Sequence, residues 1–109
     1  MQSLSVRKAV MLAAATGATT TAWFGPTVGG PKTFQANLAG TGAIDAVVEI
    51  HGSLDGSNLG AIVGTISIAG TTTVSGGFAL NEPWLYFRAK LVSINGTSAS
   101  IGVFCGETV

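Results

Sequence analysis

Residues 83–104 read PWLYFRAKLVSINGTSASIGVF, and the first part of this stretch alternates with a period of two. One side of such a strand is apolar and consists of Leu85, Phe87, Ala89 and Leu91. The other side combines two aromatic rings with two cations, namely Trp84, Tyr86, Arg88 and Lys90. A period of two is the side-chain period of a β-strand, so the stretch predicts a strand with one face in a core.

Similar short stretches recur along the chain and are separated by turn-forming residues. We expect strands at residues 8–15, 19–24, 32–38, 44–54, 61–69, 71–79, 84–94 and 99–105. Glycine, proline, asparagine and aspartate lie between them, as turns require, and Asn95-Gly96 is typical of a hairpin that joins the last two strands. No long segment has a helical apolar repeat. The sequence therefore predicts an all-β, antiparallel two-sheet β-sandwich of about eight strands, with jelly-roll or other Greek-key connections.

The 109 residues suffice for a single domain, residues 1–109. Within it, residues 1–30 are interpreted as a first hairpin or as an N-terminal arm that is exchanged with a neighbouring subunit. Arg7-Lys8 followed by the apolar residues 9–15 also imitates a secretory signal, but threonines interrupt the run early. A membrane span is not expected, since it needs roughly 20 consecutive apolar residues.

Charge is scarce and balanced in this sequence. Charged residues make up 9%, with five basic and five acidic side chains, against a usual share of roughly 25%. No strong field is available to attract nucleic acid or an anionic membrane, so we expect neither as a partner. A surface with so little charge is instead expected to be covered by protein neighbours. Cys105 is the sole cysteine, which excludes an intramolecular disulfide and favours a buried structural thiol over a reactive one.

Catalytic constellations are missing from the sequence. His51 is the single histidine, so neither a histidine metal cluster nor a supported hydrolytic triad can be built. Asp45 and Glu49 would lie about 13 Å apart on one strand, too far for paired acid–base chemistry. The DGSN segment at residues 55–58 offers one carboxylate, so turn formation is favoured over calcium binding. We expect no catalytic, metal or cofactor site, and no enzyme.

The row of aromatic and cationic residues at 84, 86, 88 and 90 has three interpretations. It is a second buried face with cations at its edge, a protein–protein surface, or a sugar platform built on Trp84 and Tyr86. Aromatic residues and arginine are enriched at interface hot spots. The candidate interface residues are Trp23, Phe24, Trp84, Tyr86, Arg88 and Lys90.

Three longer segments carry a family resemblance. They read GPKTFQANLAGTGAIDAVVEIHGSLDGSN (residues 30–58), IVGTISIAGTTTVSGGFA (62–79) and EPWLYFRAKLVSINGTSASIGVFCG (82–106), and AATGATTTAWF (14–24) fits as a leading hairpin. In this order they resemble a group of small structural proteins of tailed bacteriophages. The resemblance implies a β-sandwich virion component without catalytic residues. Leu59 stands where an aromatic residue is commoner in the group, which weakens a sugar-stacking role for that loop.

Together the residues and the resemblance lead to one expected function. The chain is expected to be a capsid decoration or cement protein that stabilises the head lattice through contacts with the major capsid protein or other virion proteins, as a homo-oligomer. Its expected location is the virion, after synthesis in the bacterial host cytoplasm. Two alternatives stay open: a tail, baseplate or neck accessory protein, and a carbohydrate-binding adhesion module whose partner is a glycan.

Overall fold

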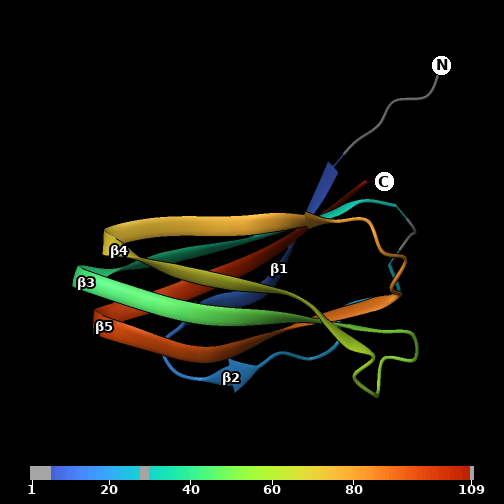
Figure 1. Ribbon diagram of the computed structural model, residues 1–109, viewed down its shortest axis with the longest axis horizontal. Coiled ribbons are helices and arrows are strands. Elements are labelled where there is room, and N and C mark those ends of the chain that lie inside the picture. Colours follow the sequence, from blue (N-terminus) through green and yellow to red (C-terminus); the bar gives the residue numbers. More distant parts are fainter. Residues whose placement is uncertain (1–5, 28–29, 109) are drawn as a thin grey trace.

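The computed structural model describes residues 6–27 and 30–108. Five strands lie in chain order along it: β1 (Val6–Ala15), β2 (Thr19–Thr20), β3 (Lys32–Ser53), β4 (Ala61–Leu80) and β5 (Tyr86–Thr108) (Figure 1). They form an antiparallel sheet in the order β1-β5-β3-β4, and β2 also pairs with β5. The predicted all-β, antiparallel class is confirmed. Within the described ranges no helix has the length and hydrophobicity that a membrane crossing needs.

Three of these strands are about twice as long as predicted. β3, β4 and β5 each join two of the expected strands, because the segments AGTGA, Gly70 and NGTS lie inside strands instead of ending them. The expected eight short strands therefore correspond to five strands in the described residues. β5 begins at Tyr86, so Trp84 and Leu85 precede the strand that was expected to contain them.

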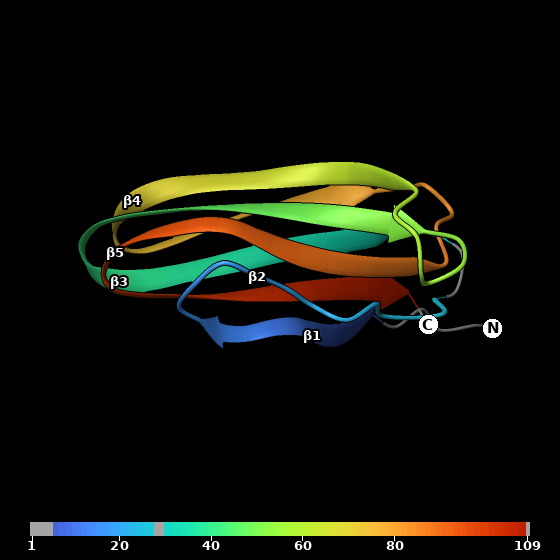
Figure 2. The same cartoon turned by 90° about the horizontal axis from the view of Figure 1, so that it is seen from below.

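The strand register shows that β3, β4 and β5 bend at the turn-forming segments that lie inside them. The first half of β3 pairs with the second halves of β4 and β5, so Phe34 lies opposite both Phe78 and Cys105. The second half of β3 pairs with the first halves of its neighbours, so Ile50 lies opposite Ala89. All three strands bend together, and the sheet folds over itself (Figure 2). The hairpin predicted at Asn95-Gly96 is wrong, because both halves of β5 pair with β3 and not with each other.

Left-handed residues mark each bend. Gly42 in β3 has a φ of 72°, Thr72 in β4 has 61°, and Gly96 in β5 has 129°. A side chain at Gly96 would also be obstructed, because its Cβ would lie 2.5 Å from the Ile44 Cγ2 and 2.9 Å from the Ala43 carbonyl oxygen. Glycine is therefore required where β5 crosses from one half of the fold to the other.

The core fills the space that the folded sheet encloses. Thirteen of its side chains are at most 2% exposed: Phe34, Ala36, Leu38, Ile44, Ala46, Val48, Ile50, Phe87, Ala89, Leu91, Ile101, Val103 and Cys105. The Phe34 ring lies at the centre, 5.3 Å from the Phe78 ring and 5.2 Å from the Phe87 ring. The alternation predicted for residues 87–91 is thus confirmed. Leu85 is 42% exposed and does not join this core, since it precedes β5.

The N-terminal segment packs against its own chain. β1 pairs with the second half of β5, and Thr19 and Thr20 of β2 pair with the first half. Within the described residues β1 and β2 both use β5 as partner, which differs from the predicted hairpin between them. Residues 1–5 and 28–29 of the predicted 1–30 segment lie outside the described residues, and exchange of this segment between subunits stays a prediction.

Two charged side chains are buried at the end of the sheet. Lys32 of β3 and Glu107 of β5 are opposite each other and are 2% and 1% exposed. The Lys32 Nζ also donates to the Gly30 carbonyl oxygen at 3.2 Å. Burial raises the pKa of the nearby Cys105 thiol to about 11; the negative charge of Glu107 adds to the rise, and Lys32 opposes it.

We predict that Cys105 is unreactive in the folded protein at pH 8, because the thiol is buried and keeps its proton. An aromatic disulfide reagent should label it only after unfolding in urea. The unfolded thiol loses its proton near its ordinary pKa of about 8.5 and the folded one near 11, so this group lowers stability as pH rises through that window. Fast labelling without urea would contradict the buried position.

We also predict that Gly96→Ala destabilises the fold by about 1–3 kcal/mol, because alanine is strained at a positive φ and its Cβ meets β3. Gly17→Ala is the matched control. A Cβ at Gly17 would have no heavy atom within 4 Å, so a change within about 0.5 kcal/mol is expected. Urea unfolding followed by fluorescence measures both, and equal stability of the two variants would contradict the role of Gly96 at the bend.

Candidate interaction surface

The segment after β2 lies along the edge of β5 and carries two of the candidate residues. The Phe24 N–H donates to the Phe87 carbonyl oxygen at 2.7 Å, and the Phe87 N–H donates back to the Phe24 carbonyl oxygen at 3.0 Å. Phe24 is half-buried and packs against the core. Trp23 is also half-buried, and its ring lies under the Arg88 guanidinium, with 4.4 Å between the Arg88 Cζ and the ring centroid. The structure thus uses Phe24 for the core and Trp23 for the outer face of β5.

Arg88 links this segment to β3. Its Nε donates to the His51 Nδ1 at 3.0 Å. An Nδ1 that accepts a hydrogen bond carries no proton, so the proton of the neutral ring is on Nε2. Nε2 then donates to the Glu49 Oε1 at 3.1 Å. The result is a continuous contact from Trp23 through Arg88 and His51 to Glu49.

Trp84 lies just before the start of β5, in the connection from β4. Its Nε1 donates to the Glu82 Oε1 at 2.7 Å, and its carbonyl oxygen accepts from the Thr27 Oγ1 at 3.2 Å. The indole ring covers Gly52 and Gly60, where an added Cβ would come within 2.8 Å and 2.5 Å of ring atoms. Two glycines from different segments therefore make the space in which this half-buried ring lies.

Tyr86 and Lys90 complete the row. The Tyr86 ring packs beside Gly56, whose added Cβ would lie 3.1 Å from it, and beside Gly25 at 3.0 Å. Lys90 is exposed on β5 and lies opposite Thr20 of β2. The row predicted from the sequence is therefore divided: the residues at 84, 86 and 88 are half-buried by their own chain, and of the four only the one at 90 is exposed.

The loop at residues 53–58 is held by one carboxylate. The Asp55 Oδ1 accepts from the Ser53 hydroxyl and from the N–H groups of Ser57 and Asn58, each at 2.9 Å, and the Asp55 Oδ2 accepts from the Asn58 side chain at 2.9 Å. These bonds, those from Asn58 above all, hold the pKa of Asp55 well below its usual range. The turn predicted for DGSN is confirmed. In the described residues no group of three histidine, cysteine or acidic side chains is arranged to hold a metal ion.

An exposed apolar surface surrounds Trp84 and was not predicted. We call it the loop-end surface, and its residues are Leu54, Leu59, Pro83 and Trp84. The two leucines are 62% and 47% exposed. One shallow hollow is lined by Leu54, Glu82, Pro83 and Trp84, and another that shares Leu54 and Trp84 also includes Leu59. Leucines inside segments that otherwise consist of turn residues are the signal that could have revealed it.

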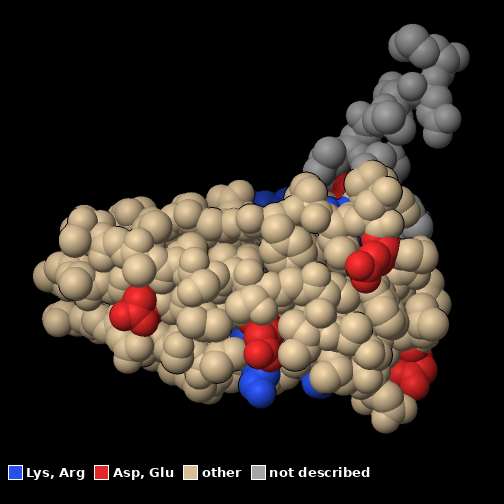
Figure 3. All heavy atoms as spheres, in the orientation of Figure 1, with Lys and Arg blue, Asp and Glu red and all other residues tan. Residues whose placement is uncertain are grey.

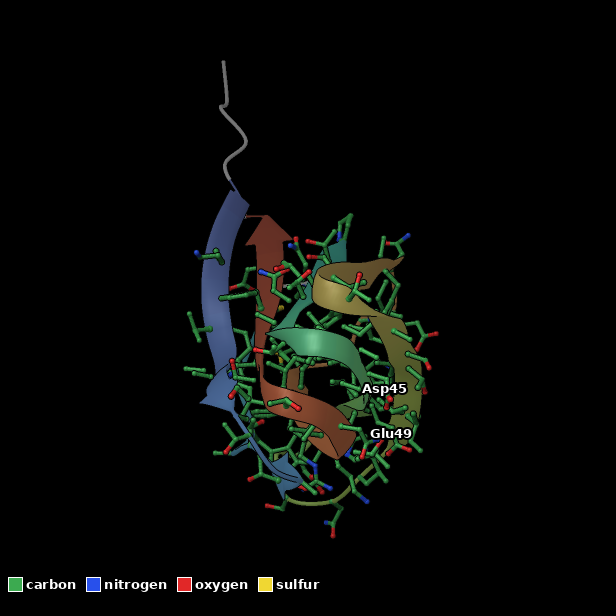
Figure 4. All side chains as sticks on the ribbon, turned by 90° about the vertical axis from the view of Figure 1, so that its left-hand side faces the viewer. Asp45 and Glu49 are labelled. Carbon is green, nitrogen blue, oxygen red and sulfur yellow. The ribbon has the colours of Figure 1, made fainter. Side chains whose placement is uncertain are left out.

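Charged side chains are sparse on the face shown in Figure 3, and near its lower middle an acidic and a basic side chain adjoin. Asp45 and Glu49 lie along the same strand (Figure 4). Asp45 accepts a hydrogen bond from the Asn95 side chain at 2.9 Å, while Glu49 is bonded to His51. Each carboxylate therefore has a neighbour of its own, and the two do not form a pair.

Comparison with known proteins identifies a shared fold. No protein-family model and no curated protein matches the chain. The crystal structure of the SPBc2 prophage-derived protein YomS is similar over 100% of this chain and 97% of that one, with a TM-score of 0.66 and 11% identity. A structure of infectious bursal disease virus, strain Gx, matches 98% of the chain with a TM-score of 0.54 and 8% identity, and the VP2 subviral particle of that virus matches 97% with 0.52 and 9%. The chain spans 32% of each of those two viral chains.

We predict that Arg88→Ala lowers the free energy of unfolding by about 1–2 kcal/mol, because it removes the stack on Trp23 and the hydrogen bond to His51. Lys90→Ala is the control on the same strand, with an exposed cation, and should change stability by at most about 0.5 kcal/mol. Thermal unfolding of both variants makes the comparison. If the two variants are equally stable, the contact from Trp23 to Glu49 contributes nothing.

Proposed function

We propose that this chain is a non-enzymatic bacteriophage virion protein that decorates and cements the head. The observation that carries the proposal is the loop-end surface: two exposed leucines beside a tryptophan, on a domain with few charges. A contiguous exposed apolar patch typically marks a binding surface for another protein. The fold shared with a prophage protein and with virus-particle chains supports the same role.

We further interpret the folded sheet as a two-layer sandwich of jelly-roll type. Bends divide β3, β4 and β5 into six segments, which with β1 and β2 make eight. In one group, the first half of β3 pairs with the second halves of β4 and β5, and β1 pairs with that half of β5. In the other group, the second half of β3 pairs with the first halves of β4 and β5, and β2 pairs with that half of β5. The apolar side chains between the two groups support this interpretation.

The proposed mechanism is the sum of many weak contacts. Trp84 presents ring area at the loop-end surface, and Tyr86 and Arg88 stiffen its surroundings by packing on glycines and on Trp23. Rigid aromatic side chains bury area at low entropic cost. Repeated docking of such a domain on a lattice of the major capsid protein lets modest single interfaces hold the shell. Trp23 and Lys90, on the outer face of β5, remain proposed interface residues, and so does Phe24 beside them, whose ring is half-buried against the core.

Two alternatives are tested by the same experiments. A tail, baseplate or neck accessory role uses the same apolar surface at a different place in the particle. A carbohydrate-binding module needs open aromatic faces, whereas Arg88 covers one face of Trp23 and the ring of Trp84 lies over Gly52 and Gly60. The glycan partner is therefore the weaker proposal.

The decisive experiment is cryo-electron microscopy of intact phage particles that are produced from the genome encoding this chain. Regular density for the domain on the head shell, with Leu54 and Trp84 against a neighbouring chain, is the expected result. Density confined to a tail or neck ring would support the accessory role. Absence of the chain from purified particles would exclude a virion role.

We predict that Leu54→Asp reduces the number of copies bound per particle at least about tenfold, because it places a charge in an apolar interface. Val10→Asp is the matched control, since Val10 is an equally exposed aliphatic residue (57%) on β1. Quantitative mass spectrometry of particles incubated with each variant gives the ratio. Equal binding of both variants would show that the loop-end surface is not the docking site.

A further inference from the structure

The order of strands leaves β4 with one free edge along its whole length. β4 pairs with β3 alone among the described strands, so the backbone N–H and C=O groups on its other side have no partner in the sheet. In Figure 2 the first half of β4 forms the upper rim of the fold, with β3 beside it. Such an edge is a template for another strand.

This edge lacks the charged residues and prolines that folded proteins usually place on edge strands. Lysine, proline and bulges normally block pairing with other molecules. All twenty residues of β4 are uncharged and none is proline. The other long edge, β1, carries Lys8, and β2 has two residues. Both long edges have two register shifts, but those of β4 lie at Val63 and at Thr72, and residues 64–70 pair with β3 without interruption between them. The free edge of β4 is therefore the one that can accept a strand.

The first half of β4 is the better template. Residues 61–69 read AIVGTISIA, in which β-branched residues predominate, whereas Gly76-Gly77 weaken the second half. Ile62, at the start of this segment, is 52% exposed, which leaves an aliphatic side chain beside the free backbone groups. A paired strand would cover both.

We propose that residues 61–69 pair in antiparallel fashion with the same residues of a second copy, across a two-fold axis. Like charges do not meet in this arrangement because the segment has none, and the net charge of the chain is zero. Each free donor of one copy meets a free acceptor of the other, since the two edges are identical. An interface in which the same surface of both copies meets across a two-fold axis is satisfied by two copies, so the assembly stops at a dimer. Pairing of β4 with the bulged, charged β1 edge would instead build an open fibre.

The proposed dimer goes beyond the virion role and does not depend on it. It is a property of the purified chain, whereas the virion role is measured on particles. A protein that dimerises but is absent from particles would separate the two.

The test is the mass of the native chain in solution, measured by light scattering after size exclusion from about 1 µM to 1 mM. A concentration-dependent dimer is expected. Thr65→Lys should weaken it about 100-fold or more, because two lysines meet close to the axis. Thr33→Lys, on the doubly paired strand β3, and Thr73→Lys, on the second half of β4, are the matched controls and should leave it intact. All three threonines are exposed, so folding should survive.

A cysteine introduced at an exposed position of residues 61–69 gives an independent test of the dimer and of its register. Thr65→Cys should form an intermolecular disulfide on mild oxidation, because antiparallel partners at the axis lie about 4.5–5.5 Å apart between Cα atoms. Ser67→Cys should not, because Ser67 lies opposite Val63 of the other copy and the two introduced cysteines are four residues apart along the strands. The buried Cys105 serves as the internal negative control. A native chain that stays monomeric at 1 mM would overturn the proposal. So would a dimer that survives Thr65→Lys, or one in which Thr65→Cys forms no disulfide.

Discussion

The double pairing of β3 is the constraint on which the rest of the structure depends. This strand has β4 on one side and β5 on the other along nearly all of its 22 residues. A bend in β3 therefore forces a bend at the same level in both neighbours, or the ladders of hydrogen bonds would be lost. The left-handed residues Gly42, Thr72 and Gly96 satisfy this requirement. The coordinated bends fold the sheet over and create the enclosed core.

The same constraint divides the molecule into two different ends. The bends of the three long strands gather at one end, on the left in Figure 1, and the connections after β3 and β4 lie at the other. Those connections carry the loop-end surface, and the loop after β3 is fixed by the Asp55 hydrogen bonds. Because the strands are held rigidly on both sides, loops that are distant in sequence meet at a defined place. Trp84 can therefore lie over Gly52 and Gly60.

Alternation in the sequence was enough to predict most strand residues and most of the core face, but not where β2 ends, where β5 begins or that Leu85 lies outside the core. The Phe87–Ala89–Leu91 row and the turn at Asp55 follow directly from local chemistry, and both are present. Strand continuity could not be predicted, because glycine and asparagine give the same signal for a hairpin and for a bend inside a strand. Which of the two forms depends on whether the two halves share a common partner, here β3. The loop-end surface was missed for a related reason, since it is assembled from segments that only the folded sheet brings together.

The few charged side chains of this chain mostly form contacts within the molecule. Most described charged side chains are engaged inside the molecule: Asp45 with Asn95, Glu49 with His51, Asp55 within its loop, Glu82 with Trp84, Lys8 over the Phe104 ring, Arg88 over Trp23, and Lys32 and Glu107 buried at the sheet end. Charges in such contacts orient side chains and loops, and few are left to repel other molecules. An isolated soluble domain normally keeps free charge on its surface for that purpose. This chain instead uses its few charges internally and leaves an apolar loop end and an uncharged strand edge open, which supports the proposed contacts with protein neighbours.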